Sequence, residues 1–294
     1  MNFEQQEESS KGSKTAFDRS WQARPESTYT HFTRSEPQNQ VQLAFRENWL
    51  NFGRLLRMFW GERDWRGLKA LEAGAGRGTM SLYFADAGFD CTMVDTSETA
   101  LDICKRIFAE QGLPGRFIKG DTLALDFAEG SFEVVFSIGL LEHFEDPAPV
   151  IAEQARVLAP QGVLLNYVVP HRPQNVQASY HWINDILRIY SGMDDIAALA
   201  KENLYRSDYA SPIYLKAMEK NGLAACGASG VYPLPMISPS IDFPFTLNTP
   251  EVEAVLVREF VRRLKQRERE TGRPGWLCDE SYGQGFVVWG CKSG

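Results

Sequence analysis

Hydrophobic residues recur through the middle of the chain in short runs that glycine-containing turns separate. Runs typical of strands cover residues 68–73, 91–95, 116–119, 132–138 and 163–169, and helical spacings lie between them over 77–87, 97–110 and 148–158. Parallel strands need long, usually helical, crossover connections. This alternation therefore predicts an α/β fold with a mostly parallel sheet and helices on both faces.

Further elements are predicted on either side of this regular part. A helix over residues 41–60 carries Phe45, Trp49, Phe52, Leu56 and Phe59 at spacings of three and four, on one face. After Pro170 the pattern predicts helices near 179–190, 194–203, 212–221 and 250–271, and strands over 223–231 and 285–289. The simplest interpretation is one α/β domain that the C-terminal third completes.

These patterns divide the chain into five segments. Residues 1–20 are polar and form a predicted mobile tail, and residues 21–66 form an N-terminal helical arm or cover. The regular core follows over 67–169. Residues 170–212 form a helical insertion that could act as a lid, and residues 213–294 supply the remaining strands and helices of the core.

Composition narrows the class of protein. The 294 residues are 44% hydrophobic and 23% charged, as in an average globular protein, and the net charge of -7 disfavours nucleic acid as a partner. No apolar run approaches the ~20 residues of a membrane span, and the acidic start is no secretory signal. Five cysteines without a Cys-x-x-Cys pair, and four histidines at no metal-site spacing, predict reduced thiols and no metal in a cytoplasmic protein.

The most informative stretch is a glycine-rich turn between the first predicted strand and its helix. It reads Glu-Ala-Gly-Ala-Gly-Arg-Gly over residues 72–78, at the sheet edge where open α/β folds bind ligands. A phosphate-binding P-loop would need Lys-Ser or Lys-Thr after its last glycine, but Thr79 and Met80 follow here. A dinucleotide fingerprint would need a glycine where Thr79 stands. The P-loop therefore fails on its residue types and the dinucleotide fingerprint on its spacing.

Three acids end successive predicted strands at this edge. Glu72 precedes the glycine turn and would repel a pyrophosphate, whereas Asp95 after the second strand suits the hydroxyls of a ribose. Asp121 follows the third strand. Three carboxylates around one crevice complement a ligand that carries cationic groups, a ribose and an exocyclic amine but no phosphate.

S-adenosylmethionine has these features, and the sequence resembles the class I S-adenosylmethionine-dependent methyltransferases over about 67–169. The resemblance depends on five blocks in the same order, at residues 71–78, 94–97, 120–121, 137–144 and 156–163. It implies a Rossmann-like, seven-stranded sheet whose last strand is antiparallel. The family has Pro-Gly-Gly where this chain has Pro-Gln-Gly over 160–162, a departure that affects a turn rather than the cofactor site.

The resemblance also implies which positions would bind the cofactor. The methionine part would be wrapped by Glu72, Gly74 and Gly76, the ribose hydroxyls bound by Asp95, the adenine contacted by Thr96, Asp121 and Thr122, and the sulfonium side lined by Ser137 and Ile138.

Methyl transfer from a sulfonium is an in-line displacement, so the protein mainly aligns the reactants and excludes water. A base matters only where the acceptor must lose a proton. His143 follows the fourth strand and is the candidate base, because a histidine pKa lies near neutrality. The alternative is a neutral ring that packs under the adjacent loop. Glu142 is expected to be a solvated or structural acid.

Substrate contacts are expected from outside the regular core. The candidates are aromatic residues of the arm and the insertion, each of which has packing as its alternative role: Tyr29, His31, His171, Tyr180, His181 and Trp182. No Asn-Pro-Pro-Tyr motif or Pro-Cys pair follows the fourth strand, which disfavours nucleic-acid methylation and favours a small-molecule acceptor. Oxygen, nitrogen and carbon acceptors all remain open.

Two other functions remain open at this stage. One is a nucleotide-dependent oxidoreductase built on a similar sheet, and the other is a non-catalytic relative that binds the cofactor.

Overall fold

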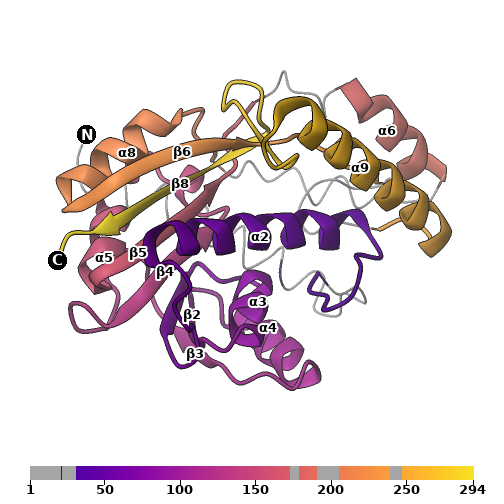
Figure 1. Ribbon diagram of the computed structural model, residues 1–294. Helices are drawn as coiled ribbons and strands as arrows, with labels where there is room; N and C mark the ends of the chain where they lie inside the picture. Colours follow the sequence, from indigo (N-terminus) through magenta and orange to yellow (C-terminus); the bar gives the residue numbers. More distant parts are fainter. Residues whose placement is uncertain (1–20, 22–30, 173–178, 191–204, 239–246) are drawn as a thin grey trace.

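The computed structural model describes residues 21, 31–172, 179–190, 205–238 and 247–294 (Figure 1). The predicted tail over 1–20 and the predicted helix over 194–203 lie outside the described residues. The strands of the described part form one sheet of eight in the order β3-β2-β1-β4-β5-β8-β6-β7. Their bounds are β1 (Lys69–Ala73), β2 (Asp90–Asp95), β3 (Arg116–Lys119), β4 (Phe132–Ile138), β5 (Leu158–Val168), β6 (Leu223–Val231), β7 (Leu277–Cys278) and β8 (Gly285–Lys292).

The sheet is mostly parallel with an antiparallel end, as predicted. β1 to β5 pair in parallel, whereas β8 is antiparallel to both β5 and β6. The predicted count of seven strands was wrong, because the two-residue β7 adds an eighth by pairing Leu277 with Val231. The chain moves outward from β1 through β2 to β3 and then returns to β4 on the other side of β1. The sheet therefore has its topological switch point between β1 and β4, where α/β folds bind ligands.

Helices cover both faces of the sheet (Figure 1). Alternate strand residues enter separate cores: Leu165 packs with side chains of the α2, α3 and α9 layer, and its neighbour Leu164 packs with those of α5 and α8. The helices of the first layer are α2 (Gln40–Trp60), α3 (Thr79–Asp86), α4 (Glu98–Glu110) and α9 (Pro250–Thr271). The remaining helices are α5 (Ala148–Val157), α6 (His181–Tyr190) and α8 (Ser211–Lys220), with a short 3₁₀ turn η1 (Leu141–His143) after β4.

Helix α2 has the apolar face that its sequence predicts. Phe52 is fully buried, and its ring centroid lies 6.5 Å from that of Phe84 on α3 and 6.3 Å from that of Phe136 on β4. Asn39 caps the helix by accepting a hydrogen bond from the Gln42 N–H. The predicted helix therefore packs across the sheet, beside the strands that carry the glycine turn.

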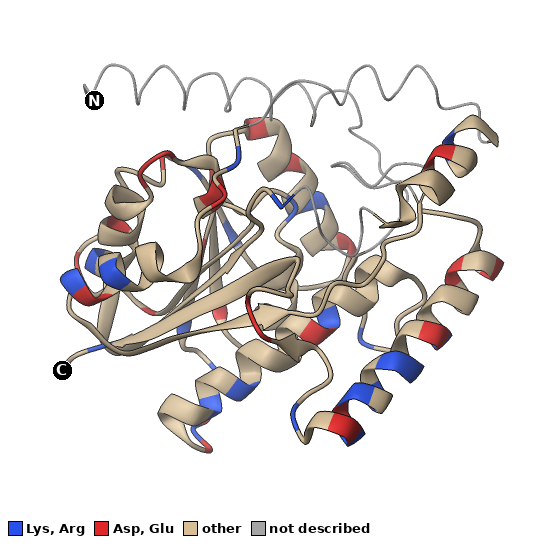
Figure 2. Ribbon diagram, turned by 90° about the horizontal axis from the view of Figure 1, so that it is seen from above, with Lys and Arg blue, Asp and Glu red and all other residues tan. Residues whose placement is uncertain are grey.

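Charged and metal-ligating side chains are distributed without an evident centre in the described part. Figure 2 shows acidic and basic positions interspersed over the coloured ribbon. Among the described residues, no helix has the length and apolar character needed to cross a bilayer. Within the same residues, no three His, Cys, Asp or Glu side chains are grouped to hold a metal ion, and the five cysteines have free thiols.

Candidate active site

The carboxyl ends of three strands are joined by backbone hydrogen bonds. The N–H groups of Gly74 and Ala75, just after β1, donate to the Val94 carbonyl on β2 at 2.9 and 3.0 Å. The Gly120 N–H, just after β3, donates to the Asp95 carbonyl at 3.0 Å. The glycine turn and the two predicted acid positions after β2 and β3 therefore share one edge of the sheet.

The turn needs glycine at two predicted positions. Gly74 has a φ of +68°, and a Cβ there would lie 2.7 Å from Cδ1 of Leu140, in the loop after β4. Gly76 has a φ of +51°, and its Cβ would lie 3.0 Å from Cζ2 of Trp21. The absence of side chains thus lets the post-β4 loop and a residue of the N-terminal arm approach the turn closely.

Asp95 organises this edge with both carboxylate oxygens. Oδ2 accepts a hydrogen bond from the Gly76 N–H at 2.8 Å, and Oδ1 accepts one from the Ser97 N–H at 2.9 Å, at the start of α4. Thr96 lies between Asp95 and Ser97 in the sequence, and both Asp95 and Thr96 are half-buried. The carboxylate therefore fixes the glycine turn relative to the loop in which a ribose is expected.

Glu72 lies at the same edge, but its carboxylate faces inward. Only 2% of the residue is exposed, and Oε2 accepts hydrogen bonds from the Ser81 hydroxyl at 2.6 Å and the Ser81 N–H at 3.2 Å, on α3. Burial, assisted by the nearby Asp95 carboxylate, raises the pKa of Glu72 to about 8. Of the three predicted acids, Asp95 and Asp121 are half-buried at the edge and Glu72 is buried behind the turn.

Glu72→Gln should change how stability depends on pH. The pKa of about 8 exceeds the ordinary value, so the native state keeps a proton that the unfolded chain releases above about pH 4.3. The unfolding free energy of the wild type should fall by about 2 kcal/mol relative to Glu72→Gln between pH 6 and pH 8. Urea titrations at several pH values measure this difference, and parallel pH curves for the two proteins would contradict it.

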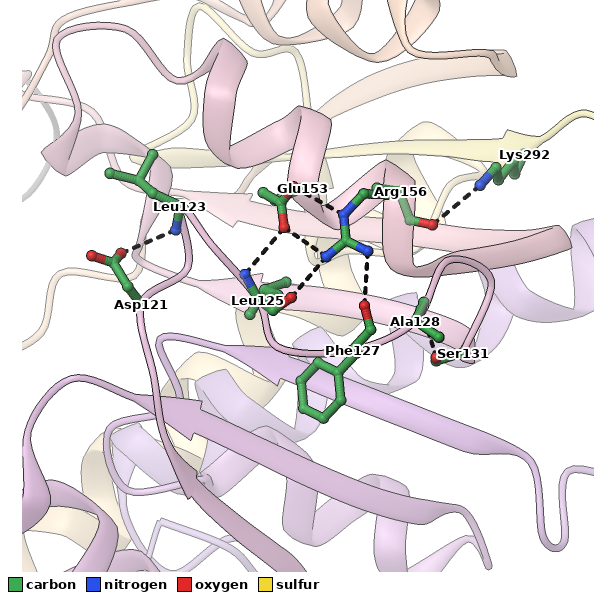
Figure 3. A network of polar contacts seen from close by, with 9 residues as sticks. All are labelled: Asp121, Leu123, Leu125, Phe127, Ala128, Ser131, Glu153, Arg156 and Lys292. Atoms are coloured by element: carbon green, nitrogen blue, oxygen red, sulfur yellow. Dashed lines mark hydrogen bonds and ion pairs between the residues drawn. The ribbon is translucent and has the colours of Figure 1, made fainter. Parts of the chain in front are cut away.

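Asp121 lies near the start of the loop that leads from β3 to β4 (Figure 3), and Thr122 follows it in the sequence. Asp121 Oδ1 accepts a hydrogen bond from the Leu123 N–H at 3.0 Å, and Thr122 is 5% exposed. The two residues therefore lie in an ordered turn directly beside the Asp95 position.

Ser137 belongs to a buried polar network within the sheet. Its hydroxyl donates to Asn166 Oδ1 on β5 at 2.6 Å, and Asn166 in turn exchanges hydrogen bonds with Gln154 of α5 at 3.0 and 3.2 Å. The Ser137 side chain thus faces α5, which leaves its backbone as the part available to line a ligand. Ile138, the last residue of β4, is half-buried against the α2 layer.

His143 is held in one orientation by the backbone at Tyr205. Its Nδ1 lies 2.7 Å from the Tyr205 carbonyl, so this nitrogen carries the proton and Nε2 is the acceptor nitrogen. Burial lowers the pKa of His143 to about 4, which keeps the ring neutral at pH 7. His143 is thus in the protonation state that a base requires.

Glu142, next to His143, is buried, which leaves the structural role of the two roles expected for it. It is 1% exposed, burial raises its pKa to about 7, and its Oε1 lies 3.9 Å from His143 Nε2. Its backbone carbonyl accepts a hydrogen bond from the Ser207 N–H at 2.8 Å. A structural role for this residue, the other half of the expectation, agrees with these contacts.

Known proteins match the part of the chain that contains this edge. Residues 71–166 match the family described as a methyltransferase domain. Residues 71–166 therefore carry a methyltransferase domain. The resemblance stated from the sequence blocks is therefore confirmed, and so is the Rossmann-like fold.

Two curated relatives align with the methyltransferase domain. One is the ubiquinone biosynthesis O-methyltransferase of Caulobacter sp. (strain K31), 35% identical over 107 residues that cover 36% of this chain and 42% of that protein. The other is the demethylmenaquinone methyltransferase of Renibacterium salmoninarum, 37% identical over 99 residues that cover 34% and 40% of the two chains. The chain thus spans less than half the length of these relatives.

Solved structures share the fold over more of the chain. A candidate sarcosine dimethylglycine methyltransferase from Galdieria sulphuraria matches with a TM-score of 0.56 at 17% identity, covering 96% of this chain and 98% of that one. A candidate methyltransferase from Bacillus halodurans C-125 matches with a TM-score of 0.50 at 16% identity, covering 83% and 100%. At this level of identity the likeness shows the fold.

The residues at the edge of the methyltransferase domain fit S-adenosylmethionine. The turn at Gly74 and Gly76 offers backbone without side chains, and the half-buried carboxylates of Asp95 and Asp121 lie beside it. These carboxylate acceptors suit a ligand with hydroxyl and amine donors and positive charge.

The residues expected to contact the acceptor differ in how deeply they are buried. His31 is buried and stacked on Phe45 of α2, with a centroid distance of 5.5 Å, and burial together with the Arg77 charge lowers its pKa to about 3. Trp182 on α6 is 63% exposed, and its neighbour His181 is exposed as well.

The remaining acceptor candidates differ in exposure. His171 is exposed, and Tyr180 is half-buried. Tyr29 lies outside the described residues. His31 comes close to the glycine turn, through the charge of Arg77.

Two residues contribute to the methyltransferase domain through partners that the sequence did not predict. Trp21 is 6% exposed and packs against Gly76 and Ile103 of α4, although the only signal for it was a large aromatic residue after a polar tail. Arg156 holds the loop that begins at Asp121, and its signal was a glutamate three residues earlier on the same predicted helix.

Proposed function

We propose that this protein is an enzyme that transfers the methyl group of S-adenosylmethionine to a small molecule by in-line displacement. The observation that carries the proposal is the position of the Gly74–Gly76 turn and Asp95 beside the switch point between β1 and β4, joined by the hydrogen bond from the Gly76 N–H to Asp95. The matching family supports the cofactor class.

Each residue then has a defined task. The cofactor supplies a methyl group that its sulfonium already activates. Gly74 and Gly76 would admit its methionine part, Asp95 would accept hydrogen bonds from the ribose, and Asp121 would accept one from the adenine amine, with Thr96 and Thr122 beside it. Ser137 and Ile138 would line the sulfonium side through their backbone. The protein aligns the reactants and excludes water, which is most of what this displacement needs.

His143 would accept the proton that a hydroxyl or amine acceptor loses. Its neutral ring and its fixed Nδ1 hydrogen bond support that role, since they present Nε2 as the basic atom. The acceptor we propose first is a hydroxylated, quinone-type ring compound, because both curated relatives described above are named for steps of quinone biosynthesis. We propose a cytoplasmic location, which the five free thiols support.

Calorimetric titration with S-adenosylhomocysteine and S-adenosylmethionine tests the cofactor assignment. Binding at micromolar to millimolar concentration is expected, and its absence would remove the proposal. Incubation with methyl-labelled cofactor and a panel of hydroquinones, catechols, phenols and amines then identifies the acceptor by mass. Binding of a nicotinamide dinucleotide instead would favour an oxidoreductase, and cofactor binding without transfer to any member of a broad panel would favour a non-catalytic relative.

A further inference from the structure

The loop between β3 and β4 is held by one arginine of α5 (Figure 3). The Arg156 guanidinium donates through Nη2 to the Leu125 carbonyl at 2.7 Å and through Nη1 to the Phe127 carbonyl at 2.8 Å. Bonds from a charged donor are stronger than neutral ones, and a planar fork fixes direction as well as distance. Two carbonyls of the loop are thus fixed to a helix of the core.

Glu153, on the preceding turn of α5, binds both Arg156 and the loop. Arg156 and Glu153 together are called the clamp below. Its carboxylate accepts from Arg156 Nε at 3.0 Å and Nη2 at 2.8 Å, and it also accepts the Leu125 N–H at 3.1 Å. Leu125 is therefore held through both its N–H and its carbonyl, by two side chains that also hold each other. This arrangement leaves the loop little freedom at that residue.

The backbone beneath the clamp is fixed as well. The Arg156 carbonyl accepts the Gly130 N–H at 3.0 Å, so the far end of the loop is bound to the same residue. Lys292 Nζ donates to the carbonyls of Ala155 at 2.9 Å and Leu158 at 2.8 Å, where α5 passes into β5. The backbone that carries the Arg156 guanidinium is therefore held in place by these hydrogen bonds.

The clamp lies four residues from Asp121, and the intervening chain is compact. The Ala124 N–H donates to the Asp121 carbonyl at 3.1 Å, and the Asp121 carboxylate accepts the Leu123 N–H. Thr122 and Leu125 are both buried, at 5% and 4% exposure. A shift at Leu125 would consequently move the turn that carries Asp121.

We propose that Arg156, supported by Glu153, is a positioning residue for recognition of the adenine amine. It holds the loop so that the Asp121 carboxylate and Thr122 meet the base, and it does not itself touch the cofactor. The inference depends on the proposed function, because it takes the ligand of this edge to be an adenosyl donor.

The test compares two ligands that differ only at the base. Calorimetry on the full-length chain measures Kd for S-adenosylhomocysteine and for S-inosylhomocysteine, which lacks the exocyclic amine. The wild type should prefer the adenosyl ligand. Arg156→Gln should raise Kd for that ligand about 5- to 30-fold and reduce the preference to near unity, and Arg156→Lys should fall between, since lysine lacks the fork.

A matched control is available on α9. Arg262 pairs with Glu259 at the same i,i+3 spacing, at 2.8 Å, but both are exposed, and the bonds of Arg262 within the described residues go to Glu259 and Gln266 of its own helix. Arg262→Gln should leave both affinities unchanged. Glu153→Gln keeps a carbonyl acceptor for the Leu125 N–H but weakens the pair with Arg156. It should reduce the preference for the adenosyl ligand in part. This variant tests the proposal if Arg156→Gln does not fold.

Several outcomes would overturn the inference. They are a wild type that binds both ligands equally, an Arg156→Gln variant that keeps the wild-type preference, and a variant that loses the two affinities by the same factor, which would indicate a general structural role. A wild type that binds neither ligand would instead contradict the proposed function.

Discussion

Asp95→Ala is expected to weaken binding of S-adenosylhomocysteine by about 1 to 3 kcal/mol, roughly 5- to 150-fold in Kd. The substitution removes an acceptor for the ribose hydroxyls. It also removes the two hydrogen bonds by which the carboxylate fixes the N–H groups of Gly76 and Ser97. The loss should therefore exceed that of a single exposed hydrogen bond.

The control for this substitution lies on the same strand. Asp90 is exposed at the opposite end of β2, away from the glycine turn, so Asp90→Ala should bind the ligand as the wild type does. Calorimetry gives Kd, and thermal unfolding shows whether the variants remain folded. An Asp95→Ala protein with wild-type affinity would refute the assignment of this carboxylate to the ribose.

Periodicity predicted most of the sheet because the central strands are long and buried. β4 spans Phe132–Ile138 and α9 spans Pro250–Thr271, at the predicted bounds. β7 could not be predicted, since two residues carry no period and their pairing with Val231 depends on tertiary contact. The start of β5 at Leu158 was also missed, because Pro160 and Gly162 indicate a turn.

The grouping of the glycine turn with Asp95 and Asp121 at one edge was predictable in the same way, since parallel strands end at one edge. The direction of each side chain followed from the alternation of residues along a strand. Leu71 packs in the α5 layer, so Glu72 points to the opposite face and meets Ser81. Ser137 shares the face of Val135 and stands in register with Asn166, so its hydroxyl bonds there. The alternation along the strands could have predicted the direction of both side chains. Their hydrogen-bond partners could be identified only from the fold.

His143→Ala should lower kcat about 10²- to 10⁴-fold on the acceptor that the panel identifies, if that acceptor loses a proton. Affinity for S-adenosylhomocysteine should stay unchanged, because the ring is expected to face the acceptor rather than the cofactor. His143→Asn separates chemistry from support. Its amide can still donate to the Tyr205 carbonyl but offers no basic nitrogen, so it should be as slow as the alanine variant.

The pH dependence of the wild type provides a second readout of the same group. Because burial lowers the pKa of His143 to about 4, the basic form persists as the pH falls, and kcat should hold from pH 8 to about pH 5 instead of declining near 6.5. A decline near pH 7 would instead report Glu142, whose pKa burial raises to about 7. Added imidazole should restore part of the rate of His143→Ala. An alanine variant with wild-type turnover would show that His143 supports the chain at Tyr205 and takes no part in the reaction.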